Sequence, residues 1–332
     1  MYIVNKIIAC CRAIKDFFVK PSKATRSQIG ALDAVEIIVA LMPLVIFGCL
    51  VFELSALCVL AISLFLNVAL DFLWNIIFKK PKIFNLQSVI FGLLAGLTLS
   101  SRLNIWLVVL ANVLAFALSK TVFKESKINF IAPWLFSRAI FAGVFFSAFS
   151  VYAVPFVHTL ESWLPLDSNY ISYSFVHTAK YLFFGIHSGN IGEVSELLLG
   201  LGGIYLIFRK IINPIIPITF IITTTVLSVA FGEILSLSLL GGGLFMAAFF
   251  LTLDYSLVTM PLYKKILYGI TCGILTFVIR RLLRTEGAYF AVIIADLLFL
   301  TITRKNVNKF IKFVKAPDFG KLFKKVKNKL SV

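Results

Sequence analysis

The sequence predicts an all-α integral membrane protein of about ten transmembrane helices, arranged as two inverted repeats of five. Of its 332 residues, 60% are hydrophobic and only 14% are charged, and the mean hydropathy is +0.98. A soluble domain has roughly 25% charged residues, so this chain lacks the polar groups to cover a surface in water. Its apolar runs approach the ~20 residues that cross a bilayer as a helix. Backbone groups in lipid must be satisfied within their own segment, which favours helices.

The apolar runs divide the chain into two repeats with basic ends. A basic leader, residues 1–30, has apolar residues at helical spacing and is expected to lie on the membrane surface. The first repeat, residues 31–158, contains spans at 34–50, 57–77, 89–99, 105–122 and 131–156. A polar external segment, residues 159–190, leads to the second repeat, residues 191–303, with spans at 195–208, 215–231, 235–253, 266–282 and 289–302. A basic amphipathic tail, residues 304–332, is expected on the anionic inner leaflet.

The net charge of +17 is distributed as a topology signal rather than as a surface for nucleic acid, and we expect no nucleic-acid partner. With the N-terminus in the cytoplasm, 26 of the 32 Lys and Arg residues fall on the cytoplasmic side, in the leader, the tail and alternate connections. This bias places both termini in the cytoplasm and requires an even number of spans. Arg280, Arg281 and Arg284 fall on the other side and do not follow the rule.

The third span of each repeat is short or interrupted by glycine. Residues 91–97 contain Gly92 and Gly96, and residues 239–245 contain three consecutive glycines. Interrupted segments at matching positions are typical of inverted-repeat membrane proteins, which place them around a central site. Close packing of helices through glycine explains the same pattern, and the sequence leaves both explanations open.

Charged residues inside the predicted spans are the candidates for an ion path or for structural charges, since each costs about 2.5–3.5 kcal/mol on insertion scales. Glu193 follows Gly192 at the start of a predicted helix, where helix capping and ion conduction are both reasonable roles. Asp296 is expected to pair with Arg280 or Arg281. The full set is Asp71, Arg138, Glu193, Glu196, Glu233, Asp254 and Asp296, of which Asp71, Glu193 and Asp254 are the preferred candidates.

Other catalytic signals are missing from the sequence. It contains no phosphate-binding loop, no zinc-protease motif and no strand–helix dinucleotide motif, so no catalytic residue is assigned. The five cysteines form no CxxC pair, and we expect no disulfide and no metal site from them. His158, His177 and His187 all fall in the external segment at spacings too long for a compact zinc motif. A folded loop could still gather them around a metal or a quinone.

Seven stretches in chain order carry a family resemblance over about residues 22–303. They are residues 40–43, 85–99, 119–133, 192–206, 211–217, 243–254 and 286–291. Each match alone is weak in so apolar a sequence, but their shared order and spacing are specific. Together they resemble the NqrB/RnfD family, whose members include the RnfD protein of the bacterial Rnf complex.

The resemblance implies a helical fold of inverted repeats, similar to that of urea channels. It implies a membrane component of a bacterial inner-membrane complex that couples ferredoxin–NAD or NADH–quinone electron transfer to Na⁺ or H⁺ movement. Its partners would then be the other membrane, flavin and Fe–S subunits, together with the lipid bilayer. The chain would not itself bind NAD or ferredoxin, because no such site is visible.

Family members also carry FMN on a threonine of an S/T-G-A-T-P motif, and here this sequence departs. Phe175 stands at the threonine position and has no oxygen to form the phosphoester. Ser174 and Thr178 are the nearest hydroxyls and the candidate attachment residues. Riboflavin or another flavin held without a covalent bond is the alternative. Without a flavin, the same scaffold would serve as a small-solute channel or transporter, or as a structural paralogue.

Overall fold

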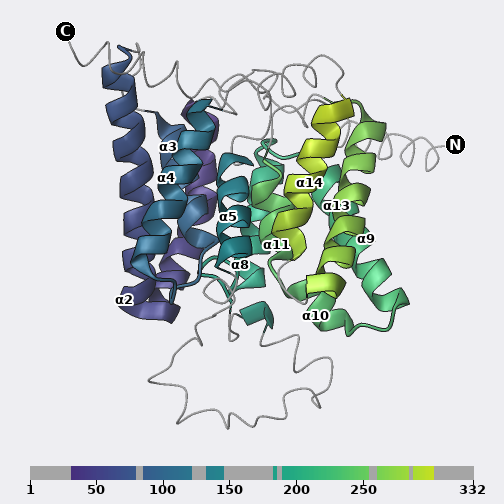
Figure 1. Cartoon of the computed structure of the whole chain (residues 1–332). Helices are drawn as coiled ribbons and strands as arrows, with labels where there is room; N and C mark the ends of the chain where they lie inside the picture. Colours follow the sequence, from purple (N-terminus) through teal and green to yellow (C-terminus); the bar gives the residue numbers. More distant parts are fainter. Residues whose placement is uncertain are drawn as a thin grey trace, which may run out of the picture.

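The computed structural model describes residues 31–79, 85–121, 132–145, 182–184, 189–253, 260–283 and 287–302. All regular elements in these ranges are helices that stand side by side as a bundle (Figure 1). In order they are α2 (Ala31–Ile77), α3 (Leu86–Leu97), α4 (Ile105–Thr121), α5 (Ala132–Val144), α8 (Glu196–Phe208), α9 (Ile215–Ala230), α10 (Leu235–Leu240), α11 (Leu244–Met246), the π-helical η2 (Ala247–Leu251), α13 (Leu262–Leu283) and α14 (Gly287–Ile302). The all-α class is therefore confirmed.

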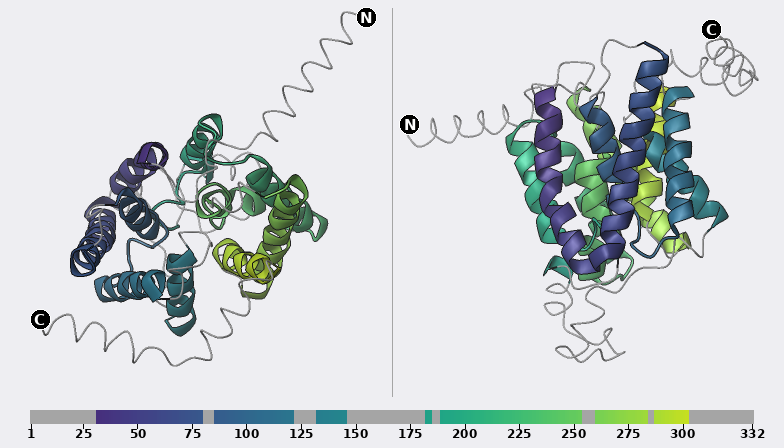
Figure 2. Two further views of the ribbon diagram at one scale, coloured as in Figure 1. Left: turned by 90° about the horizontal axis from the view of Figure 1, so that it is seen from above. Right: turned by 90° about the vertical axis from the view of Figure 1, so that its left-hand side faces the viewer.

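The long element α2 is a helical hairpin. Glu53 breaks it with φ 54° and ψ −142°, and the hydroxyl of Ser55 donates to the carbonyl of Phe52 at 2.6 Å. Figure 2 shows the two arms side by side, with the bend at one end of the bundle and both helix ends at the other. The arms correspond to the predicted spans at 34–50 and 57–77.

The outer surface of the bundle is apolar. Leu54, Phe65 and Phe208 are each 71% exposed, and many other large apolar side chains are exposed with them. Asp33–Ile77 and Leu262–Leu282 are long and apolar enough to cross a membrane, and the other apolar helices among the described residues are shorter. An apolar surface around helices with internally bonded backbones is the arrangement that lipid requires.

The helices pack in a matching order in the two halves. In the first half, α3 and α4 pack on α2, and α5 packs on α4. In the second half, η2 and α10 pack on α9, α13 packs on α9, and α14 packs on α13. The halves meet where α2 contacts α8 and where α5 contacts α14.

The two glycine-rich segments have different structural roles. In α3, a Cβ on Gly92 would lie 2.9 Å from Cα of Leu64, and one on Gly96 would lie 3.2 Å from Cα of Leu60, so these glycines allow close packing on α2. Gly242 and Gly243 have φ of +62° and +66° and separate α10 from α11. Glycine therefore serves close packing in α3 and accompanies a break in the helix at residues 241–243.

Candidate functional site

The end of α3 and the entry to α8 meet in the interior of the bundle. The amide of Ile191 donates to the carbonyl of Leu99 at 3.0 Å, and the amide of Gly192 donates to that of Leu97 at 2.7 Å. A Cβ on Gly192 would lie 3.0 Å from the Leu97 carbonyl oxygen, so this approach requires glycine. The contact carries Glu193, the next residue, into the buried interior, where it is 4% exposed.

Two side chains of α5 hold the C-terminal end of α3. The indole of Trp134 donates to the hydroxyl of Thr98 at 2.8 Å, and Nε of Arg138 donates to the Thr98 carbonyl at 3.1 Å. The Arg138 guanidinium also lies 4.1 Å from the centroid of the Tyr289 ring, on α14. A buried cation is favoured at a helix C-terminus and over an aromatic face, so Arg138 joins the two halves at this point.

Two buried carboxylates lie next to this contact. A Cβ on Gly243 would lie 2.5 Å from Oε1 of Glu193 and 3.0 Å from Oη of Tyr289, so both oxygens converge on the break before α11. Glu196 is 1% exposed and interacts electrostatically with Glu193 and Arg280. Oε2 of Glu196 and Oη of Tyr289 accept or donate no hydrogen bond within the described residues. We call this set the central cluster: Arg138, Glu193, Glu196, Arg280 and Tyr289.

The entry to α8 differs in detail from the expectation for Glu193. The helix begins at Glu196, and the side chain of Ser195 caps it by accepting from the Leu198 amide at 3.5 Å. Glu193 precedes the cap and faces the start of α11 instead. Both carboxylates are buried, and the sequence pattern could not assign them to different helix ends.

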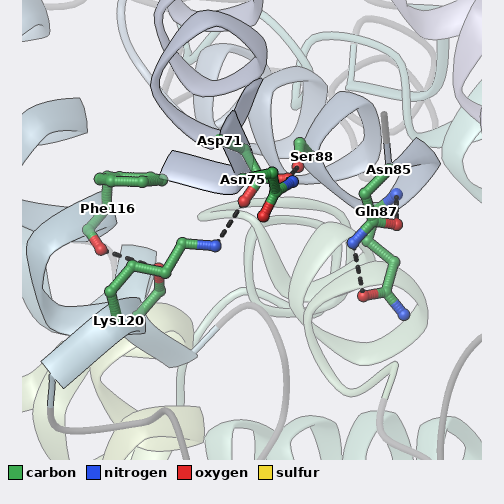
Figure 3. A network of polar contacts seen from close by, with 8 residues as sticks. Asp71, Asn75, Asn85, Gln87, Ser88, Phe116 and Lys120 are labelled. Carbon is green, nitrogen blue, oxygen red and sulfur yellow. Dashed lines mark hydrogen bonds and ion pairs between the residues drawn. The ribbon is translucent and has the colours of Figure 1, made fainter. Parts of the chain in front are cut away.

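Asp71, the second of the preferred residues, belongs to a separate cluster that joins α2, α3 and α4 (Figure 3). Its carboxylate forms an ion pair with Lys120 and accepts from Ser88 at 2.7 Å and from Asn75 at 3.1 Å. The Lys120 ammonium also lies 5.0 Å from the Phe116 ring centroid. The structure therefore brings Glu193 and Asp71 into different sites.

Several polar partners have no counterpart among the residues predicted from the sequence. Glu36 accepts hydrogen bonds from Tyr205 and Arg209 and so ties α2 to α8. Its place in the apolar run at 34–50 was a usable signal. Asn67 donates to Asn112 at 2.7 Å between α2 and α4, and this pair is uncharged and carries no signal in a charge-based search.

Asp296 has a hydrogen-bond partner that the sequence did not indicate. Its carboxylate accepts from the hydroxyl of Tyr268 at 2.7 Å, whereas Arg280 donates to backbone carbonyls and Arg281 lies 5.2 Å from the Phe231 ring centroid. Tyr268, on the facing helix α13, is therefore a partner of Asp296 that the charge pattern did not indicate, and the pairing with Arg280 or Arg281 stays a prediction.

Several predicted residues lie outside the described residues. They are Asp254, the candidate flavin positions Ser174 and Thr178, the departure at Phe175, and the three histidines. Their roles remain predictions.

Known proteins resemble this chain over most of its length. The chain is 29% identical over 282 residues to the D subunit of the Na⁺-translocating ferredoxin:NAD⁺ oxidoreductase complex of Acetobacterium woodii, covering 83% of this chain and 87% of that protein. It is 27% identical over 302 residues to the D subunit of the proton-translocating ferredoxin:NAD⁺ oxidoreductase complex of Clostridium ljungdahlii, covering 84% and 89%. It is 25% identical over 244 residues to the B subunit of the Na⁺-translocating NADH-quinone reductase of Pseudoalteromonas atlantica, covering 68% and 60%. The NQR2, RnfD, RnfE family matches residues 24–312, and the chain belongs to this membrane-protein family.

Proposed function

We propose that this chain is the membrane subunit of an Rnf- or Nqr-like complex that couples electron transfer to Na⁺ or H⁺ translocation across a bacterial inner membrane. Family membership and the names of the relatives support the complex and its other subunits as partners. The observation that carries an ion-translocating role is the central cluster, where two buried carboxylates lie between the halves of an apolar bundle. Buried charges in lipid-embedded helices are expensive and commonly mark ion paths.

The proposal includes two inverted repeats of five spans, at residues 31–158 and 191–303, with both termini cytoplasmic. The leader 1–30, the external segment 159–190 and the tail 304–332 complete the division. The matching order of helix packing in the two halves supports the repeat. The ends of α3 and η2 also support it, because Thr98 and Thr252 follow a leucine there and have φ of −86° and −88°. Equivalent contacts between repeats, α2 with α8 and α5 with α14, fit a two-fold relation.

Within this scheme, Glu193 and Glu196 line the ion path, and Asp254 belongs to the same path by its place in the family match. Asp71 has a structural role, because Lys120, Ser88 and Asn75 already satisfy its carboxylate. The cluster contains both signs of charge, so an entering cation must compete with Arg138 and Arg280 for the carboxylates.

The test uses the complex reconstituted in vesicles with its companion subunits. We expect Glu193→Gln and Glu196→Gln to reduce ion uptake per electron transferred about tenfold or more, since each removes a buried charge that attracts the ion. Glu53→Gln, at the exposed bend of α2, is the matched control and should behave as wild type. Unchanged ion uptake in both buried variants would give these carboxylates a purely structural role.

The flavin requires its own experiment. A flavin-fluorescent band on a denaturing gel, with an FMN-sized adduct on Ser174 or Thr178 in the peptide covering residues 169–180, would identify a relocated attachment site. A dark band with an unmodified peptide would leave a flavin held without a covalent bond, or none. In that case Phe175 favours the second candidate function, a small-solute channel or a structural paralogue on the same scaffold. Solute-dependent swelling of vesicles carrying the purified chain would identify the channel.

A further inference from the structure

Arg280, in the last turn of α13, holds three backbone carbonyls at the break between α10 and α11. Its Nη1 donates to the carbonyl of Ser238 at 2.9 Å, and its Nη2 donates to those of Gly241 at 2.6 Å and Gly242 at 3.2 Å. A Cβ on Gly242 would lie 3.1 Å from Nη2, and one on Gly287 would lie 2.9 Å from Cγ of the arginine. Glycines on both sides therefore leave room for this one side chain.

Three convergent carbonyl oxygens form the kind of ligand set that binds a dehydrated monovalent cation in a membrane protein. The carbonyls at the end of a helix carry its negative dipole end, and unwound backbone in broken helices coordinates Na⁺ in other transporters. Gly242 and Gly243, both with positive φ, turn the backbone here, and a residue with a side chain would be strained in that conformation. The guanidinium thus takes the place that a cation would take.

A second observation connects Arg280 with Glu196, another residue of the central cluster. The charge of Arg280 acts on Glu196, whose Oε2 is buried and has no hydrogen-bond partner in the part of the chain that the structure describes. A cation leaving the carbonyls would find this unsatisfied oxygen nearby. The same contacts account for one of the three arginines that depart from the charge bias, because the carbonyls favour a positive charge at this end of α13.

We propose that the Arg280 guanidinium is a tethered cation that occupies a monovalent-cation site formed by the carbonyls of Ser238, Gly241 and Gly242. While it is in place, it blocks passive ion movement through the break, and an ion passes only when the arginine gives up these carbonyls. The inference rests on the proposed function, since it assumes an ion path at the central cluster. It goes further by assigning the residue that keeps the path closed at rest.

The first test compares Arg280→Gln with Arg281→Gln in the full chain purified in detergent. Arg281 is the neighbouring residue, has the same charge and lies over Phe231, so it is a matched control. We expect the melting temperature of Arg280→Gln to rise by about 3 °C when Na⁺ replaces choline, because the emptied site then binds Na⁺. Wild type and Arg281→Gln should show no such difference. Each protein is compared with itself, so a general loss of stability does not affect the result.

The second test measures passive ²²Na⁺ uptake into vesicles that contain the chain alone, with no electron donor. We expect Arg280→Gln to take up Na⁺ about tenfold faster than wild type and Arg281→Gln, because a like charge no longer repels the ion. Arg280→Lys retains the charge but reaches fewer of the three oxygens, so its uptake rate should be intermediate. If Arg280→Gln does not fold, the comparison of Arg280→Lys with wild type is the test. Rates and melting temperatures equal to wild type in folded variants would overturn the proposal. These assays need no companion subunits, so their failure is separable from a failure of coupled transport in the Glu193 and Glu196 variants.

Discussion

At the scale of single residues, several charged side chains of this protein have partners on other helices. Asp71 is paired with Lys120, Glu36 with Arg209, and Arg138 with the Thr98 carbonyl and the Tyr289 ring. An unmatched charge inside an apolar bundle is strongly unfavourable. The partners come from helices far apart in sequence, so their contacts hold these helices together. Removing one partner of a buried pair should therefore lower the free energy of unfolding more than removing both partners.

The Asp71–Lys120 pair allows a direct test of that asymmetry. We expect Lys120→Met to lower the free energy of unfolding by about 3–5 kcal/mol, because it leaves the Asp71 carboxylate buried without its cation. The double variant Asp71→Asn with Lys120→Met should lose markedly less. Unfolding in detergent measures both, with Lys79→Met, at an exposed position, as the control. The pairing would be contradicted if the double variant lost as much free energy of unfolding as the single variants Asp71→Asn and Lys120→Met lose together.

Two buried tyrosines provide a second test at this scale. Tyr268 and Tyr289 are 0% and 1% exposed, but only the Tyr268 hydroxyl has a hydrogen-bond partner among the described residues, the carboxylate of Asp296. We expect Tyr268→Phe to lower the unfolding free energy by about 1–3 kcal/mol, since it leaves a buried acceptor unsatisfied. Tyr289→Phe should change it by less than about 0.5 kcal/mol, because the ring under Arg138 remains. Equal losses in the two variants would show that the hydroxyl of Tyr289 has a structural partner.

At the scale of helices, glycine decides how closely two elements approach. In α8, a Cβ on Gly203 would lie 2.4 Å from Cγ of Phe249 in η2, whereas one on Gly200 would lie 3.8 Å from the nearest atom of Phe245. The same substitution therefore has opposite consequences at two positions of one helix. We expect Gly203→Ala to lower the unfolding free energy by about 1–3 kcal/mol through overpacking. Gly200→Ala should be neutral or stabilise by up to about 1 kcal/mol through helix propensity.

Thermal unfolding of the two variants beside wild type makes this comparison. A Gly203→Ala protein as stable as Gly200→Ala would mean that η2 moves away from α8 without loss. Gly203 would then not be required for the contact between α8 and η2.

Helix positions were largely predictable, and helix irregularities were not. The predicted spans at 34–50 and 57–77 match the arms of α2, because apolar run length directly reports the membrane-crossing segments. The span predicted at 235–253 instead comprises α10, a break, α11 and a π-helical turn. Most of its residues are apolar, so hydropathy cannot reveal where the backbone leaves the helix. Only the three consecutive glycines indicated the place.

At the scale of the whole molecule, both ends of α2 lie at one end of the bundle and its bend lies at the other (Figure 2). This arrangement gives a test of orientation with two matched positions. Lys79 and Glu53 are both exposed and both have positive φ, at opposite ends of the second arm of α2. We expect a cysteine at Lys79 to react with an impermeant maleimide from the cytoplasmic side, and a cysteine at Glu53 to react from the outside. Labelling of both from one side would contradict the hairpin across the membrane.

The sequence by itself determined the membrane class, the order of the helices and the family, because these depend on composition, run length and the order of local motifs. It also identified Asp71, Glu193 and Glu196 as unusual charges. Only the tertiary structure decided what surrounds the buried charges: Lys120 for Asp71, the break before α11 for Glu193, and Tyr268 for Asp296. The sequence shows that a charge lies in an apolar run, where burial is costly. It does not show which side chain of another helix offsets that cost, because the partner lies many residues away.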